Sequence, residues 1–282
     1  MTQEKLPCIA KNLCYNKCGD NMDRKNIDKI AENPEDRLLL AKLWDKISAG
    51  YQKNILSHTQ FLSPREIQLA KYLFGEQPGL YAFGGYHGAE RKMYIYLPDY
   101  LSEDSLTSED SPIVCLRASF FKDDTLTHRD VLGALIGCGI TRQSIGDILI
   151  SDHFCDFFIT AETAPFILDT LQSAGRVNLK LSMVALSDII VPEQKFLEIN
   201  DTVASPRLDS IIASGFQISR TAAAESISAG KAAIDGLPCD KPDKTVEEKA
   251  KISVRGLGKL KLFQIGHTTK KGRISVIIHR YQ

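Results

Sequence analysis

The chain of 282 residues predicts an α+β protein with three units, at residues 1–78, 79–195 and 196–282. Three observations lead to this division. Apolar residues recur at helical spacing in the first unit, period-two alternation broken by two helical stretches fills the second, and the third begins with a helical pair followed by short strands and glycine turns. We expect N-terminal helices, a middle sandwich with its helices on one face of a mostly antiparallel sheet, and a separate C-terminal unit.

Two helix starts mark the first unit. Asn33 precedes Pro34, which suits an N-cap followed by the first helical position. Ser63 precedes a second helix, and Glu66 three residues later predicts a capping box.

The middle unit alternates strands and helices. Residues 80–98 predict a hairpin with a glycine-rich turn. Thr127 is expected to cap a helix that ends at Gly139. A second helix is expected to end at Gly175. Further strands are predicted at 112–121, 147–152, 153–160 and 177–184, the last with Val177, Leu179, Leu181 and Met183 on its buried side.

The C-terminal unit follows a connection at 192–206. Residues 207–231 predict two helices, the first ended by a left-handed turn at Gly215. Strands are expected on both sides of the Asp235-Gly236 turn, at 252–255, at 259–265 and at 274–281. In the range 259–265, Lys259 and Lys261 alternate with leucines, so both lysines are expected on one face.

Charge is unevenly distributed in a chain whose net charge is zero. From residue 207 onward there are 14 Lys and Arg against 7 Asp and Glu, and the preceding residues carry the opposite excess. From residue 251 onward there are 8 basic residues and no carboxylate. This clustering indicates a local site for a polyanion, with a lysine-rich solvated surface as the weaker alternative.

The cysteines indicate reduced thiols, because their number, seven, is odd and most lie in apolar runs. Cys8, Cys14 and Cys18 are spaced irregularly, which favours free thiols on an extension over a zinc site. No apolar run approaches the roughly 18 residues that span a bilayer, and the N-terminus lacks the apolar core of a secretion signal. We expect a cytoplasmic monomer without membrane contact, metal or cofactor.

No motif predicts catalysis. His128-Arg129-Asp130 matches the His-Arg-Asp motif of a kinase catalytic loop, but the downstream Asn, the glycine-rich loop and the Asp-Phe-Gly motif are missing. A capped helix start explains these residues better. Gly133 and Gly137 lie within a helix, which is not where a nucleotide-binding loop occurs.

Residues 207–231 give the strongest binding signal. Ser219 is expected to cap the second helix, whose N-terminal N–H groups favour phosphate, and Arg220 stands beside it. Small alanines allow the helices to pack closely; the alternative is a helical hairpin that only packs. The glycine-rich turn at 84–92 allows close approach to another chain, with an ordinary hairpin equally open. A second surface for a polyanion such as RNA would comprise His87, Arg91, Lys92, Arg129 and Arg142.

The C-terminal pattern resembles the RNA-binding module named after small-subunit ribosomal protein S-four. The matching residues are Arg207-Leu208-Asp209, Gly215, Ser219-Arg220, Ala223, Ile227, Gly230, Lys231, Asp235-Gly236 and Arg255-Gly256-Leu257-Gly258. Asp235 replaces the usual Asn, and residues 247–252 replace a Gly-Asp. The stretches 83–92, 126–150 and 269–281 are further similar to the bacterial YlmH family, over about residue 35 to the end.

This resemblance implies a middle domain like an RNA-recognition motif (RRM-like) and a C-terminal S-four domain. It also implies association with ribosomal RNA of the large subunit and with peptidyl-tRNA, in the quality control of stalled ribosomes. By position, RNA contacts fall on Arg207, Ser219, Arg220 and Lys231. Thr221 and Arg255 join them, and charge alone adds Lys259, Lys261, Lys270, Lys271 and Arg273.

The favoured hypothesis is therefore a non-enzymatic RNA-binding protein. The alternative is an RNA-modifying enzyme of pseudouridine synthase or methyltransferase type that carries the same module, although no catalytic constellation is found. A protein partner bound through the acidic first 206 residues is compatible with either hypothesis.

Overall fold

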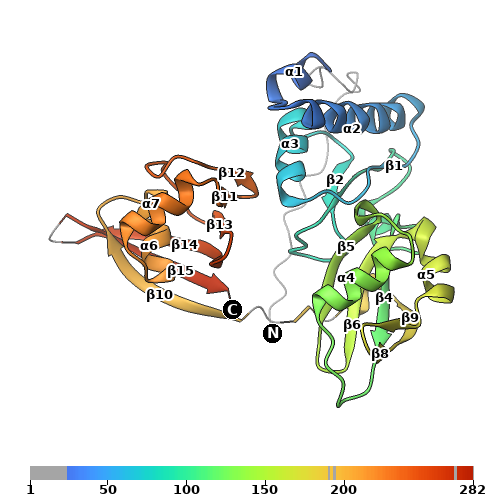
Figure 1. The fold of residues 1–282 in the computed structure, drawn as a ribbon. Coiled ribbons are helices and arrows are strands. Elements are labelled where there is room, and N and C mark those ends of the chain that lie inside the picture. Colours follow the sequence, from blue (N-terminus) through green and yellow to red (C-terminus); the bar gives the residue numbers. More distant parts are fainter. Residues whose placement is uncertain (1–23, 190, 193–194, 270–271, 282) are drawn as a thin grey trace, which may run out of the picture.

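The computed structural model describes residues 24–189, 191–192, 195–269 and 272–281. It contains N-terminal helices, a middle sheet with two helices on it, and a C-terminal sheet with two helices (Figure 1). The α+β fold class with these three parts is thus confirmed. Cys8, Cys14, Cys18, Lys270 and Lys271 lie outside the described residues. Within the described ranges, no helix has the length and apolar character that crossing a bilayer demands.

Capping residues fix the N-terminal helices as predicted. Helix α2 (Pro34–Lys53) begins after Asn33, whose side chain accepts from the Asp36 N–H, and α3 (Pro64–Phe74) begins with the capping box of Ser63 and Glu66. The preceding turns are η1 (Arg24–Asn26) and α1 (Ile27–Ile30).

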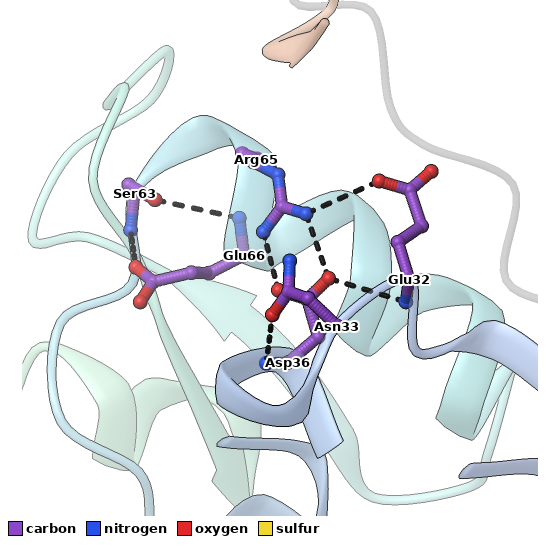
Figure 2. Close-up of polar contacts among 6 residues, drawn as sticks. All are labelled: Glu32, Asn33, Asp36, Ser63, Arg65 and Glu66. Carbon is purple, nitrogen blue, oxygen red and sulfur yellow. Dashed lines mark hydrogen bonds and ion pairs between the residues drawn. The ribbon is translucent and has the colours of Figure 1, made fainter. Parts of the chain in front are cut away.

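A buried ion pair holds the starts of α2 and α3 together. The guanidinium of Arg65 donates to both oxygens of Asp36 at 2.6 and 2.7 Å, and the backbone N–H of Glu32 also reaches this carboxylate (Figure 2). Asp36 is buried, and the hydrogen bond from Arg65 lowers its pKa against the opposing effect of burial. The N-terminus of α3 is therefore a fixed platform.

The predicted glycine-rich hairpin forms, but its strands join a small sheet of their own. Strands β2 (Leu80–Phe83) and β3 (Met93–Tyr96) pair with each other, and β3 also pairs with β1 (Ser57–His58). The hairpin therefore lies with elements of the N-terminal part. The boundary at residues 78 and 79 stays a prediction.

The middle sheet has the strand order β5-β6-β4-β9. The chain order is strand, helix, strand, strand, helix, strand, which is the ferredoxin-like arrangement. Its elements are β4 (Ile113–Ser119), α4 (His128–Gly137), β5 (Ile145–Ile150), β6 (Phe154–Thr160), α5 (Ala164–Thr170) and β9 (Lys180–Val184). Thr127 caps α4 as predicted. Short 3-10 turns connect these elements at Glu103–Leu106, Arg142–Ser144, Ala161–Thr163 and Leu186–Asp188.

Two predictions for this unit are wrong. The helix expected to reach Gly175 ends at Thr170, because Gly175, at φ +61°, forms the turn between β7 (Ser173–Ala174) and β8 (Val177–Asn178). Met183 is 61% exposed rather than buried. Its strand, β9, lies at the edge of the sheet, where fewer neighbours cover it.

The two faces of the middle sheet are covered by different parts of the chain. Helices α4 and α5 cover one face, through Val131 and Ile167 among others. On the other face, Phe61, Met93 and Ile95 of the N-terminal part pack against a cluster that includes Cys115 and Phe158. Gly146 permits this contact, since a Cβ there would stand 2.7 Å from the ring of Phe61.

The C-terminal sheet has the order β10-β15-β14-β13-β11-β12. Its strands are β10 (Phe196–Val203), β11 (Ala232–Ile234), β12 (Leu237–Pro238), β13 (Lys251–Val254), β14 (Gly258–Thr268) and β15 (Ile274–Tyr281). Helices α6 (Leu208–Phe216) and α7 (Arg220–Ser228) follow β10. The segment predicted as a connection, 192–206, thus contains the whole of β10, which pairs with β15 over its full length.

Gly215 does not end α6 as predicted. The helix continues to Phe216, and Gln217 adopts the left-handed conformation, at φ 57°. Gly215 instead faces the sheet, where a Cβ would stand 2.6 Å from Cδ1 of Leu260 and 3.3 Å from Cγ2 of Ile278. Glycine is therefore needed here for close packing of helix on sheet.

Candidate nucleic-acid interface

Arg207 and Arg220 meet at one carboxylate. Arg207 is the N-cap residue of α6 and Arg220 is the first residue of α7, yet both guanidinium groups donate to Asp209. The distances to Asp209 Oδ2 are 3.1 Å from Arg207 Nη2 and 2.8 Å from Arg220 Nη2. The two arginines predicted to bind RNA are thus held side by side.

The Asp209 carboxylate is buried while its partners reach solvent. Its side chain is 7% exposed, against 39% for Arg207 and 56% for Arg220. Burial alone raises the pKa of Asp209, but the hydrogen bonds from the two arginines outweigh it, so the pKa lies below the usual 3.8. The carboxylate is charged at neutral pH and orients two cations whose remaining donors stay accessible.

The start of α7 has the geometry expected for an anion site. The Ser219 hydroxyl accepts from the Ala222 N–H at 3.1 Å, which confirms the predicted cap. Thr221 is exposed at the first turn. A hollow of about 270 Å³ beside this turn is lined by Arg220 and by Arg273, which directly precedes β15. Arg273 donates to the hydroxyl and the carbonyl of Thr202.

We call this side of the C-terminal sheet the helical face, defined by Arg207, Ser219, Arg220, Thr221 and Arg273. Arg280 of β15 also points to this side, since its guanidinium lies over the ring of Phe216.

Lys231 and Arg255 lie next to each other at one end of the sheet, where the Arg255 N–H donates to the Lys231 carbonyl at 2.9 Å. Both are exposed. Sequence reasoning did not single out Arg280.

Lys259 and Lys261 lie on the opposite side of the sheet. The residues that alternate with them, Leu260 and Leu262, are fully buried under the helices, so the lysines point away from α6 and α7. Lys259 forms an ion pair with Glu90, with Nζ 2.7 and 2.9 Å from its two oxygens. The predicted RNA-binding residues are therefore divided between two faces of one sheet.

The suggested second surface contains two arginines with a structural role. Arg91 donates to the carbonyls of Phe61, Arg142 and Ile145, and Arg142 donates to those of Ile145 and Gly146. Burial lowers the pKa of Arg91 to about 10, which still leaves it charged at neutral pH. The Arg91 guanidinium holds the small sheet on the middle sheet, whereas that of Arg142 fixes the turn into β5. His87 and Arg129 are exposed, and Lys92 is half-buried.

Comparisons with known proteins find matching domain models and similar proteins. The family model described as "Putative RNA-binding domain in YlmH" matches residues 118–188, and the model described as "S4 domain" matches residues 206–252. "Ribosome-associated protein quality control protein P2" of Bacillus subtilis (strain 168) is 33% identical over 223 residues, which are 79% of this chain and 86% of that protein. A solved structure, "Cell division protein ylmH from Streptococcus pneumoniae", is 24% identical, covers 57% of this chain and 97% of that chain, and has a TM-score of 0.45.

Proposed function

The chain belongs to the YlmH family, and we propose that it is an RNA-binding protein that acts on the large ribosomal subunit and on tRNA in ribosome-associated quality control. The name of its relative from Bacillus subtilis supports the process, and the two matching domain models support RNA as the ligand. The model matched at residues 118–188 is described as an RNA-binding domain, which favours this function over the RNA-modifying enzyme.

The helical face is the proposed contact with folded RNA. The observation that carries the proposal is the pair of arginines held by Asp209 at the start of α7. Guanidinium groups suit phosphate oxygens, and the N-terminal turn of α7 adds favourable backbone N–H groups. Such a surface recognises RNA by shape and phosphate position rather than by base edges.

The middle sheet has the strand order of an RRM-like domain, and this supports a second contribution to RNA binding. The face that RRM sheets use is partly covered here by Phe61, Met93 and Ile95. His87 and Lys92 belong to the hairpin and Arg129 to α4, so none of them lies on a strand of the middle sheet. We assign these three residues to this contribution from outside the sheet, and leave out Arg91 and Arg142, whose guanidinium groups donate to carbonyls.

The test is co-sedimentation with purified large subunits at low and high salt, with and without tRNA. We expect the wild type to bind and Arg207→Gln/Arg220→Gln to lose most of the binding. The wild-type affinity should fall steeply with salt, since each phosphate contact in a duplex adds about 0.9 to the slope of log K against log salt. Unchanged binding by the variant contradicts the assignment of these residues.

Two controls separate binding from folding. Lys29→Gln/Lys53→Gln removes the same charge from exposed positions on the N-terminal helices and should bind normally. Adding Asp209→Asn to the double variant removes the unpaired carboxylate that it leaves behind, and should restore the fold without restoring binding. Mass analysis of ribosomal RNA from cells with and without the protein tests the enzyme alternative, which predicts the loss of one modified nucleotide on deletion.

A further inference from the structure

We propose that the C-terminal sheet carries a second RNA site on the side opposite α6 and α7, and that this site binds an unpaired segment of RNA. We call this side the outer face, defined by Lys249, Lys251, Lys259, Lys261, Phe263 and His279. The proposal rests on the proposed function in that it takes RNA as the ligand. It assigns unpaired strands to a surface distinct from the helical face.

Two of the four lysines of the outer face, Lys251 and Lys261, carry charges that no carboxylate of the described residues pairs with. Lys251 of β13 lies directly opposite Lys261 of β14, and Lys261 lies directly opposite His279 of β15. Within the described part of the chain, neither lysine has a carboxylate at ion-pair distance. Like charges placed opposite each other destabilise a sheet. A bound anion would remove this repulsion, and the pair therefore points to a ligand.

Aromatic rings alternate with these cations. Phe263 stacks on His279 with 4.2 Å between the ring centroids, and Lys249 Nζ lies 3.8 Å from the centroid of Phe263. Phe196, at the far end of this row, stacks on His279 at 4.0 Å and is 46% exposed. Lysines beside an exposed ring are the combination that binds single strands, with phosphates on the amines and a base on the ring. Phe196 is the ring suited to this role, since His279 and Lys249 both lie against Phe263.

A cleft borders this face. It has a volume of about 320 Å³ and lies between the outer face and the N-terminal part, with Lys92, Lys249, Lys251 and Lys259 on its walls. This volume is at the lower end of the range that holds a small molecule. It suits a nucleotide of an unpaired strand and excludes a duplex. Tyr281 also lines the cleft, and burial raises its pKa, so that its hydroxyl stays a donor.

The N-terminal part fixes one wall of the cleft. The Asp235-Gly236 turn approaches the start of α3 so closely that a Cβ on Gly236 would stand 2.6 Å from the Arg65 backbone nitrogen. That start is the platform held by the Arg65–Asp36 pair (Figure 2). Among the described residues, Glu198 lies 3.5 Å from His279 Nε2, Glu248 lies 3.8 Å from Lys249 Nζ, and Glu90 forms its ion pair with Lys259. An RNA phosphate would compete with Glu90 for that lysine.

The test is fluorescence anisotropy with a labelled oligouridine of about 10 nucleotides. We expect Lys251→Gln/Lys261→Gln to weaken its binding at least tenfold at low salt. The slope of log K against log salt should fall by about 1.4, since each phosphate contact of a single strand contributes about 0.7. Glu90→Gln should tighten binding several-fold, because it frees Lys259. Lys29→Gln/Lys53→Gln is the charge-matched control and should match the wild type.

The outcomes separate this proposal from the proposed function. If Lys251→Gln/Lys261→Gln binds the oligonucleotide like the wild type and with the same salt slope, the outer face is not an RNA site, whatever the large-subunit result. If the oligonucleotide fails to bind while a polyglutamate peptide binds in a lysine-dependent way, the ligand is an acidic protein segment and the proposal is overturned. Continued large-subunit binding by this variant, with oligonucleotide binding lost, supports both proposals.

Discussion

Arg220 Nη2 lies 2.8 Å from Asp209 Oδ2, on a carboxylate that Arg207 also contacts. The buried acid thus links the first turns of two helices and aims both arginines toward the same solvent region. An acid among residues proposed to bind a polyanion lowers the net charge of the surface. Asp209 favours binding by orienting the two guanidinium groups, because groups that are already fixed lose less conformational freedom when they bind phosphate.

Replacing Asp209 should therefore weaken both the fold and RNA binding. We expect Asp209→Ala to lower the free energy of unfolding by about 1 to 2 kcal/mol, a value reduced for the solvent exposure of both arginines. Affinity for tRNA should fall although a negative charge is removed. Urea unfolding and filter binding measure the two effects. As a control, Asp243→Asn changes an exposed acid nearby and should leave the free energy of unfolding within about 0.5 kcal/mol of the wild-type value. Tighter tRNA binding by Asp209→Ala would refute the orienting role.

Acid should remove the contribution of Asp209 to stability. Its pKa is lower in the folded chain than the usual 3.8, so it stabilises the fold above that value and the contribution is lost as pH falls through the folded pKa. The stability difference between wild type and Asp209→Asn should be largest near neutral pH and shrink below about pH 4. Urea midpoints measured across this range test the sign. A difference that grows on acidification contradicts the assignment.

Gly215 should tolerate no larger residue. A Cβ at this position meets Leu260 at 2.6 Å, so Gly215→Ala should cost about 1 to 3 kcal/mol through overpacking. Gly133 is the matched control, since it lies within α4 and a Cβ there meets nothing within 4 Å. Gly133→Ala should stabilise the protein by about 0.5 to 1 kcal/mol through helix propensity. Thermal unfolding distinguishes these opposite shifts; similar shifts for both variants would show that the contact with Leu260 is not limiting.

The lysine pair of the outer face should lower stability. Either Lys251→Gln or Lys261→Gln should raise the free energy of unfolding by a few tenths to about 1 kcal/mol in the absence of RNA. The double-mutant cycle should give a repulsive coupling at low salt that disappears near 1 M salt, where the screening length is about 3 Å. A coupling of zero at low salt would show that the two amines avoid each other in solution.

Local signals in the sequence predicted the helix starts correctly, and they predicted the alternation correctly in β14 although not at Met183 of β9. Asn33, Ser63, Thr127 and Ser219 all act as caps, because a cap depends only on residues within one turn of the helix. The alternation around Leu260 likewise placed the neighbouring lysines on one face, since side chains of a strand alternate by geometry alone.

Contacts between distant segments could not be predicted in this way. The glycine-rich hairpin pairs with β1, and Arg91 binds carbonyls that belong to residues 30 to 54 positions away in the chain. A glycine at position 215 is typical of a helix end, but here it allows α6 to pack closely on the sheet. The sequence could not show this, because its neighbours Leu260 and Ile278 come from later strands.

The sequence by itself determined the family, the position of the basic C-terminal unit, and the arginines and helix caps that belong to it. Only the tertiary structure decided which cations act together. It brings Arg207 and Arg220 to one buried carboxylate, and it turns Lys259 and Lys261 to the other side of the sheet. The reason is physical: charge and capping are properties of short segments, whereas the face a side chain occupies depends on what the opposite face must bury.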